Sequence, residues 1–197
     1  MNAGRPREFN TEHALAAATQ QFWRVGYEAT SLHDLLDEMK LSKSSLYQTF
    51  GSKHALFIRS IDYYQESLVD DLSEVLEDSR SSKAFLQKFL EGVVAEASSI
   101  KKKGCLLVNT ANELAHRDKT ISKAVSRGMS NVANVIKLAI EQGKEENTIS
   151  SKVKTDELVS YVMTNVSGLR TMIKSGAKKT TLNPVVSLTL KTIYTSA

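Results

Sequence analysis

The chemistry that the sequence offers most plainly is that of a thiol, because the chain holds a single cysteine, Cys105. This residue follows Gly104 and the run Lys101 to Lys103, and it opens an apolar segment that predicts a helix. A helix N-terminus and nearby cations both stabilise a thiolate, which is the form that reacts with oxidants and electrophiles. A lone cysteine is also common as an inert apolar side chain, so a reactive thiol and a structural thiol are both open.

The patterns of an enzyme are missing from the sequence. The four histidines, at 13, 33, 54 and 116, form no pair at the i, i+4 spacing of a zinc site. There is no glycine-rich phosphate loop and no Gly-x-Ser-x-Gly motif. His116 and Cys105 cannot meet within one helix, because their spacing corresponds to about 16 Å of helical rise. We therefore expect a protein that is not an enzyme and holds no metal or other cofactor.

A second group of polar residues suits contact with nucleic acid. A short helix after Ser42 would present small or hydrogen-bonding side chains to a major groove. These side chains are Lys43, Ser44, Ser45, Tyr47 and Gln48. Ser42 and Lys53 stand at helix starts, where free N–H groups favour a phosphate, and Arg5 and Arg7 on an N-terminal arm could enter a minor groove. The same pattern fits the solvated face of a helical adaptor that binds no DNA.

The composition predicts an all-α protein. Hydrophobic residues make up 41% and charged residues 24% of the chain, and the only prolines are Pro6 and Pro184, so long helices are allowed between them. The net charge of +4 is too small to indicate nucleic acid by itself. No apolar signal segment or membrane-spanning run occurs, and we expect a cytoplasmic protein without a membrane partner.

Apolar periodicity and capping residues predict the helices. We expect them near 11–25, 32–39, 43–49, 52–76, 81–99, 105–116, 120–145, 155–175 and 183–196. Thr30 or Ser31 would cap the second helix, with Asp34 in the position of a capping box. The first three helices can share a small core of Leu15, Phe22, Leu32, Leu35, Leu36, Leu41, Leu46 and Phe50. Two short helices after a longer one predict a helix-turn-helix unit.

The residues themselves resemble a known signature. The stretch 26–32, GYEATSL, and the stretch 41–53, LSKSSLYQTFGSK, are similar to the tetracycline-repressor (TetR) family, as are GRPR at 4–7 and the helix that carries Phe22. The resemblance covers roughly residues 5–60. It implies a TetR-like, dimeric, all-α transcription factor, usually a repressor, that binds a palindromic operator in double-stranded DNA.

The resemblance also divides the chain and assigns roles. Residues 1–52 would be the helix-turn-helix DNA-binding domain with its arm, and residues 53–197 the helical effector-binding and dimerisation domain. Phosphate contacts would come from Thr30, Ser31, Ser42, Tyr47 and Lys53. Base contacts would come from Lys43, Ser44, Ser45 and Gln48. Tyr47 could instead pack in the small core. Lys40 departs from the family, which often has glycine there. Either lysine adopts a positive φ, which costs about 1 kcal/mol, or the turn is adjusted.

Two late helices have wide apolar faces. They carry Leu158, Val159, Val162, Met163, Val166, Leu169, Met172 and Ile173, and Val185, Val186, Leu188, Leu190 and Ile193. In the family such a pair forms a four-helix bundle across a two-fold axis, which would make the protein a homodimer. The alternative is ordinary packing within one chain.

Two modes of sensing are open. Gly104-Cys105-Leu106, together with Gly168 and Lys174, resembles the branch of the family that senses reactive chlorine and electrophiles, in which a cysteine and a lysine form the switch. The other mode is a non-covalent small-molecule effector in a pocket among the helices from 81 to 175. Its possible lining is Phe85, Phe89, Leu107, Asn109, Met163 and Arg170. Phe and Met at helical spacing are also typical of a plain core.

Overall fold

The computed structural model describes residues 10–98 and 103–194, which form nine α-helices, one 3₁₀ turn and no strand. The predicted all-α class is confirmed for this part of the chain. The helices are α1 (Thr11–Val25), α2 (Leu32–Met39), α3 (Lys43–Phe50), α4 (Lys53–Glu77), α5 (Ser82–Ala95), α6 (Leu106–Leu114), α7 (Lys119–Glu145), α8 (Thr155–Lys174) and α9 (Lys179–Tyr194). The 3₁₀ turn is η1 (Glu96–Ser98).

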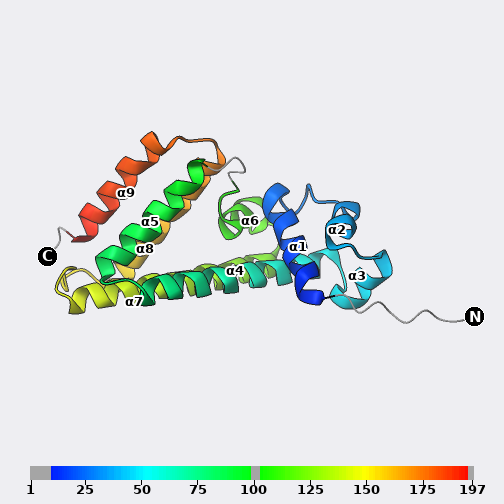
Figure 1. Ribbon diagram of the computed structural model, residues 1–197, viewed down its shortest axis with the longest axis horizontal. Coiled ribbons are helices and arrows are strands. Elements are labelled where there is room, and N and C mark those ends of the chain that lie inside the picture. The colour runs from blue at the N-terminus through cyan, green and yellow to red at the C-terminus, as the bar shows by residue number, and fades with distance from the viewer. Residues whose placement is uncertain (1–9, 99–102, 195–197) are drawn as a thin grey trace, which may run out of the picture.

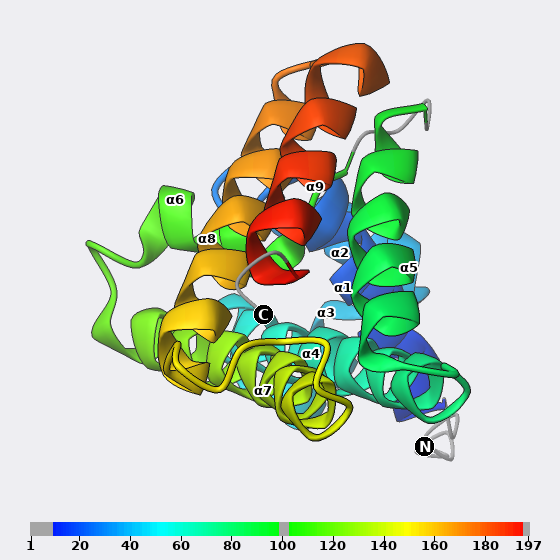
Figure 2. The same ribbon diagram turned by 90° about the vertical axis from the view of Figure 1, so that its left-hand side faces the viewer.

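Two long helices, α4 and α7, pack along each other and form the base of the molecule (Figure 1). Helices α1 to α3 gather at one end of this base, and α5, α8 and α9 rise from the other end. Turned by 90°, the molecule shows α5, α8 and α9 standing on α4 and α7 (Figure 2). Helix α6 lies between the two groups, where it can contact both.

The core at the first end joins α1 to α3 with the start of α4, with α6 and with the first half of α7. Phe22, Leu35, Leu46 and Phe50 are buried in it, and the other four residues of the predicted small core pack against it. That prediction is confirmed. Because Phe57 of α4 is also fully buried there, α4 belongs physically to the three-helix unit as well as to the rest of the chain.

The core at the other end is formed by the last turns of α4 with α5, the second half of α7, α8 and α9. Helices α4 and α7 thus contribute to both cores and connect them. The division of the chain after residue 52 coincides with the start of α4 at Lys53, but it stays a prediction. None of the helices in the described residues has the length and apolar character that crossing a membrane requires.

Two predicted helix boundaries are wrong. Helix α5 ends at Ala95 rather than near 99, because η1 continues the chain as a 3₁₀ turn. Helix α9 begins at Lys179 rather than near 183, so Pro184 lies inside it. Starting at Lys179 aligns Leu182 with the other buried positions of α9, Val186, Thr189 and Ile193. The burial of Leu182 offsets the hydrogen bond that Pro184, exposed on the outer face, cannot donate.

Candidate nucleic-acid interface and sensory region

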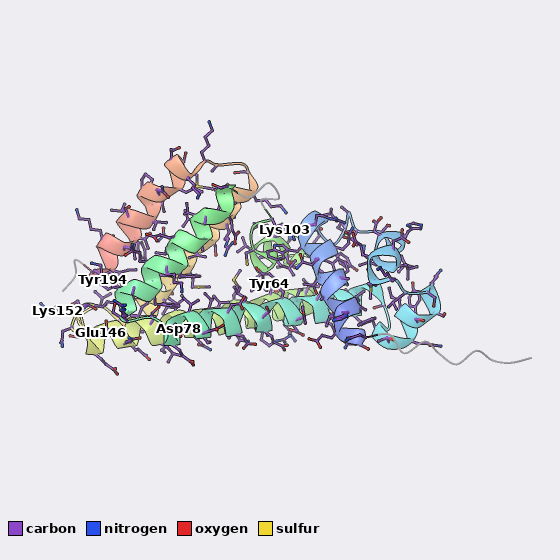
Figure 3. The ribbon with its side chains drawn as sticks, viewed as in Figure 1. Tyr64, Asp78, Lys103, Glu146, Lys152 and Tyr194 are labelled. Carbon is purple, nitrogen blue, oxygen red and sulfur yellow. The ribbon has the colours of Figure 1, made fainter. Side chains whose placement is uncertain are left out.

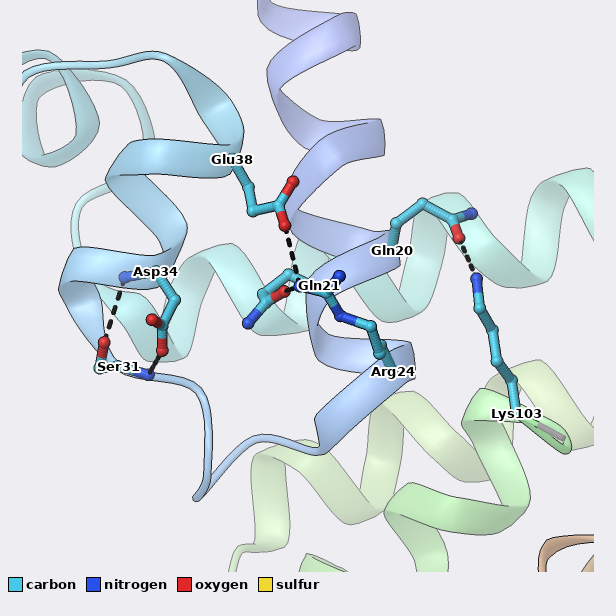
Figure 4. A network of polar contacts seen from close by, with 7 residues as sticks. All are labelled: Gln20, Gln21, Arg24, Ser31, Asp34, Glu38 and Lys103. Carbon is cyan, nitrogen blue, oxygen red and sulfur yellow. Dashed lines mark hydrogen bonds and ion pairs between the residues drawn. The ribbon is translucent and has the colours of Figure 1, made fainter. Parts of the chain in front are cut away.

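Helix α2 is held by polar contacts at both ends, as Figure 4 shows. Ser31 caps it, because the Asp34 amide donates to the Ser31 hydroxyl at 3.1 Å and the Ser31 amide donates to the Asp34 carboxylate at 2.8 Å. These hydrogen bonds lower the pKa of Asp34. Arg24 of α1 forms an ion pair with Glu38 at 2.8 Å. The predicted capping box is confirmed, and α2 is fixed against α1.

The turn into α3 also follows its local signals. Lys40 adopts a left-handed conformation with φ 53° and ψ 41°, so of the two alternatives the positive φ is the one observed. Ser42 then caps α3 by accepting a hydrogen bond from the Ser45 amide at 3.2 Å. The hydroxyl groups of Ser44 and Ser45 both lie 2.9 Å from the Ser42 hydroxyl. Three hydroxyl groups therefore surround the N-terminus of α3, where an anion is favoured.

Helix α3 turns one face inward and the other to solvent. Leu46 and Phe50 are buried in the first core, whereas Lys43, Ser44 and Gln48 are exposed and Ser45 is half-buried. The Tyr47 side chain is 43% exposed, so its ring is not part of the small core. The outward face consists of short or hydrogen-bonding side chains, which allow close approach to the edges of base pairs.

Of the residues predicted to contact phosphates, Lys53 and Thr30 have different surroundings. Lys53 is the first residue of α4, and its ammonium group lies 4.4 Å from the centroid of the Tyr27 ring. Thr30, in contrast, is fully buried, and its hydroxyl donates to the Gly26 carbonyl at 2.6 Å. The predicted phosphate contact of Thr30 is therefore not supported, because that hydroxyl already closes the turn before α2. Arg5 and Arg7 lie outside the described residues.

Cys105 is the N-cap residue of α6 and is 7% exposed. Its sulfur faces Tyr64, and the charge of Arg170 acts on both groups. Burial raises the pKa of Tyr64 well above its ordinary value, and the neighbouring Cys105 raises it further. Arg170, almost buried, forms an ion pair with Glu96. The cation placed beside the thiol is thus Arg170, which the sequence analysis assigned to a pocket lining.

Of the three lysines before Cys105 that were expected to place positive charge near its thiol, only Lys103 lies in the described part of the chain. Lys101 and Lys102 lie outside the described residues. The Lys103 ammonium group donates to the Gln20 side chain at 2.6 Å and lies 4.8 Å from the Trp23 ring centroid, so it is directed to α1 (Figure 4). Tyr64 and Lys103 both lie where α4, α6 and α1 converge, far from Tyr194 and Lys152 at the other end (Figure 3).

Lys174 has different surroundings from Cys105. It is exposed in the last turn of α8 and lines a cavity together with Leu106, Asn109 and Glu113 of α6. Cys105 does not line that cavity. The predicted partnership of Cys105 with Lys174 consequently has no support from the described contacts, and it stays a prediction.

The six residues expected to line one effector pocket do not converge. Phe85 and Phe89 are buried in the second core with their ring centroids 6.1 Å apart, and Leu107 is buried in the first core. Met163 lines a groove between α7 and α8. Asn109 lines the cavity that holds Lys174, and Arg170 lines a separate cavity with Tyr64. The single pocket was a wrong prediction, because the aromatic side chains fill the space between helices themselves.

Contacts between α1 and the segment that leads into α6 were not predicted from the sequence. The Trp23 indole N–H donates to the Gly104 carbonyl at 2.9 Å, next to Cys105. Gly104 has φ 68°, and a Cβ atom there would lie 3.3 Å from the Asn109 side chain, so the turn favours glycine. The signal available in the sequence was Trp23 itself, the chain's one tryptophan, on a helix that also carries the core residue Phe22.

The far end of α6 makes the second such contact. Both oxygens of the Glu113 carboxylate accept backbone hydrogen bonds from the turn between α1 and α2, from Tyr27 at 3.3 Å and from Glu28 at 2.9 Å. His54 of α4 also contacts Asp118, the N-cap of α7, at 2.8 Å. Backbone bonds at the start of α7, followed by the bond to His54, lower the pKa of Asp118. The bond from Trp23 to Gly104 and the two bonds to Glu113 thus attach both ends of α6 to the unit formed by α1 to α3.

Two family models match the chain over most of its length. Residues 14–59 match the model of bacterial regulatory proteins of the tetR family, and residues 83–186 match the tetracyclin repressor-like C-terminal domain. The chain belongs to the TetR family. It is therefore a DNA-binding transcriptional regulator rather than an enzyme, and the resemblance noted in its sequence is confirmed.

Similar proteins agree with this membership. An uncharacterised helix-turn-helix regulator of Bacillus subtilis, YezE, is 30% identical over 150 residues, which cover 76% of this chain and 77% of YezE. The repressor ComR of Escherichia coli is 23% identical and covers 95% of this chain and 90% of its own. A solved complex of a cysteine mutant of the TetR regulator CifR with operator DNA is 27% identical, with a TM-score of 0.83 over 95% of this chain and 98% of CifR.

In this TetR-family chain the exposed face of α3 lies on the last helix of the three-helix unit, within the residues that match the N-terminal family model. The contacts of Trp23 and Glu113 link that unit to α6, whose first residue follows Cys105. The described residues contain no cluster of histidine, cysteine and carboxylate side chains that could hold a metal ion.

Proposed function

We propose that the protein is a dimeric, cytoplasmic repressor that binds a palindromic operator and is released from it by an effector. The observation that carries this proposal is the exposed face of α3, which has a capped, hydroxyl-rich N-terminus. The known functions of relatives support it, since ComR is a repressor and CifR has been solved on double-strand operator DNA. A two-fold dimer presents two such helices about 34 Å apart, which suits a palindrome.

The surface of α8 and α9 supports the dimer. Leu188 is 62% exposed and Met172 is 38% exposed, while Val159, Met163 and Leu190 are only partly covered by their own chain. The other residues of the two predicted faces are mostly buried within the chain, so the available apolar surface is narrower than the sequence indicates. These exposed side chains would be covered by the second copy of α8 and α9.

Lys53 gives a test of the phosphate contacts. We expect Lys53→Met to weaken operator binding about three- to tenfold and to reduce the slope of log affinity against log salt by about 1, because one counterion fewer is released. Fluorescence anisotropy of labelled operator DNA between low and moderate salt measures both. Lys123→Met on the exposed surface of α7 is the matched control. An unchanged salt slope for Lys53→Met would refute its contact with a phosphate.

Gln48 gives a test of base reading. We expect Gln48→Ala to lower the discrimination between bases at one operator position by about 1–3 kcal/mol, because an amide pairs with a base edge in the major groove. Binding to unrelated DNA should hardly change. A set of operators substituted one base pair at a time, each titrated by anisotropy, locates the affected position. Equal loss on every operator would contradict the role of Gln48 in specificity.

For the effector we propose covalent modification of Cys105. The residue stands at the N-terminus of α6, and the Arg170 guanidinium and the Tyr64 side chain are its neighbours. A cavity of about 270 Å³ is lined by Arg170, Tyr64 and Trp23, so its wall includes neighbours of Cys105 but not Cys105 itself. Hypochlorous acid would oxidise the thiol to a sulfenic acid, and its chlorine would be released as chloride together with one proton. N-ethylmaleimide would instead add across its carbon–carbon double bond, with sulfur bonded to one carbon and the thiol proton transferred to the other.

The link from Cys105 to DNA runs through its neighbour in the chain. A larger group on the Cys105 sulfur has to displace Tyr64 or move the start of α6, and the Gly104 carbonyl that accepts from Trp23 would move with it. Because Trp23 lies on α1, such a shift changes the position of the α3 face relative to its copy in the dimer. Release then follows if the modified protein favours the arrangement with the wrong spacing.

The first experiment is anisotropy on DNA from upstream of the protein's own gene, before and after treatment with hypochlorite or N-ethylmaleimide. We expect treatment to release wild type and to leave Cys105→Ser bound, because serine keeps the size of the side chain without its reactivity. If both proteins stay bound, or both are released alike, the thiol mechanism fails. Lys174→Met tests the predicted lysine partner, since a response identical to wild type would exclude it.

A non-covalent effector is the second candidate. It is favoured by a specific observation, a cavity that has walls from both parts of the chain and an exposed cation at its edge.

A further inference from the structure

An open groove of about 490 Å³ lies between α7 and α8, and neither the reading of DNA nor the thiol mechanism uses it. Met129 and Ala133 of α7 and Val159 and Met163 of α8 form its apolar part, and short serine and threonine side chains complete it. Every residue that the structure describes in its lining is uncharged and is exposed or half-buried. This α7–α8 groove is therefore accessible from outside rather than filled by its own chain.

Three other cavities differ from the α7–α8 groove because charged side chains line them. Glu113 and Lys174 line one, Glu91 and Lys179 line another, and Arg170 lines the third. An apolar group that covered these charges would remove them from water, which is costly. The α7–α8 groove carries no such penalty, so its chemistry fits an apolar side chain.

The two walls of the groove are joined at one end. The Lys137 ammonium group of α7 lies 3.2 Å from the Asp156 carboxylate of α8. These two residues stand one helical turn from Ala133 and Ser160, which line the groove. Because the groove is formed by two packed helices and not by a loop, it presents a defined shape to a partner.

The groove opens onto the outer face of α8. Ser160 and Thr164 line the groove and are exposed. Gly168, one turn further along the same face, has no other group within 4 Å of the position that a Cβ atom would take, apart from its own helix backbone and chain neighbours. A helix that packs across these small residues can approach α8 closely, and its side chains then reach the groove.

Leu188 of α9 is an apolar side chain without cover. At 62% it has the largest exposed fraction among the large apolar side chains that the structure describes. Pro184, exposed, and Val185, half-buried, lie on the same face of α9 at the i−4 and i−3 positions. An apolar surface of this kind marks contact with a partner.

The groove and Leu188 belong to different faces of one chain. Leu188 is not among the residues that line the groove, so a second copy has to supply it. A two-fold interface repeats each contact, with residue i on residue j of the partner and residue j on residue i. One leucine and one groove in each chain therefore give two equal contacts in a dimer.

We propose that, in the dimer, the α7–α8 groove of each chain receives the partner's Leu188 and thereby determines which chains pair. This inference rests on the proposed function, of which the dimer is a part, and it adds α7 to the contact surface. A chain with a small side chain at 188, or with a filled groove, makes a poor partner, and rejecting such chains is one source of specificity.

Cysteine pairing tests the contact directly. Cys105→Ser removes the native thiol from two differently tagged chains; one then carries Leu188→Cys and the other Ala133→Cys or Ser160→Cys, one on each wall of the groove. After mixing and mild oxidation, we expect a disulfide between the two tags for at least one wall, because a disulfide needs Cα atoms within about 7 Å. Leu138→Cys, on the exposed surface of α7 outside the groove, is the matched control.

Filling the groove tests the specificity. We expect Leu188→Ala to weaken the dimer about 100-fold in sedimentation, tenfold for each of the two contacts. Ala133→Phe fills the groove and should weaken the dimer similarly. Mixed together, these two chains should prefer each other, because the filled groove then meets the small side chain and the open groove meets a leucine. Leu138→Ala should leave the dimer unchanged, and circular dichroism checks the fold of each variant.

The outcomes separate this proposal from the proposed function. If the wild type sediments as a monomer, the dimer and the groove contact both fail. If it is a dimer but neither wall position cross-links to Leu188→Cys more than Leu138→Cys does, the groove contact is wrong and the repressor function stands. If the cross-link and the preference for mixed pairs appear but the protein does not bind its upstream DNA, the repressor function fails and the groove contact stands.

Discussion

Phe57→Ala is expected to lower the free energy of unfolding by about 3 to 5 kcal/mol, the usual loss for a buried phenylalanine. The Phe57 side chain is fully buried, and its ring packs against both Phe22 and Tyr27 at 4.8 Å. Alanine removes both ring contacts and leaves a space that the surrounding helices cannot fully close. Urea unfolding followed by circular dichroism measures the loss. The free energy of unfolding of a typical domain is about 5 to 15 kcal/mol, so this single substitution removes a large fraction of it.

The control for Phe57→Ala is Tyr47→Ala on the exposed face of α3. We expect Tyr47→Ala to change the free energy of unfolding by less than about 0.5 kcal/mol, because its ring is outside the core, and to weaken operator binding instead. The free energy of unfolding of Phe57→Leu should lie between those of Phe57→Ala and Tyr47→Ala. Equal stability of Phe57→Ala and Tyr47→Ala would show that α4 does not share a core with the helix-turn-helix unit.

The DNA-binding unit could be predicted from the sequence because its signals are local. Ser31 and Asp34 form their capping box within four residues, and Ser42 caps the next helix in the same way. At Lys40 the sequence indicated a turn and left its conformation open, and the observed residue is left-handed. Each of these features depends on residues a few positions apart, so spacing and residue type were enough.

The sensory region could not be predicted in the same way, because its contacts join residues far apart in the chain. Cys105 meets Tyr64 of α4 and the charge of Arg170 of α8, and no local pattern announces either. Lys103 was read as a cation for Cys105, but its ammonium group is directed to Trp23 and Gln20. Only the position of Cys105 before α6 was foreseen, since that again is local.

The pocket prediction failed for a related physical reason. Helical spacing shows which residues face inward, but it does not show whether facing side chains leave space between them. Phe85 and Phe89 stack on each other, and no cavity remains there for a ligand. The cavities lie instead where separate packing units meet, as at Trp23, and those junctions depend on the tertiary arrangement.

Glu113→Ala is expected to separate the sensory region from the DNA-binding unit. The carboxylate accepts backbone N–H groups of Tyr27 and Glu28, and alanine leaves both without their acceptor. Hydrogen bonds to charged groups contribute about 1.5 to 3 kcal/mol, so we expect a loss of that size in the free energy of unfolding. Because α6 then keeps only its apolar packing and the bond from Trp23 to Gly104, the change in operator affinity on effector treatment should fall several-fold.

The matched variants decide what a loss in Glu113→Ala means. Glu157→Ala removes an exposed carboxylate from the first turn of α8 and should leave both stability and effector response unchanged. Glu113→Gln keeps one acceptor oxygen and should retain part of the stability and part of the effector response. If Glu113→Ala responds to effector like wild type while its stability falls, the contact is only structural. In that case the bond from Trp23 to the Gly104 carbonyl, next to Cys105, carries the coupling, and Trp23→Phe would abolish the response while keeping an aromatic ring against Tyr64.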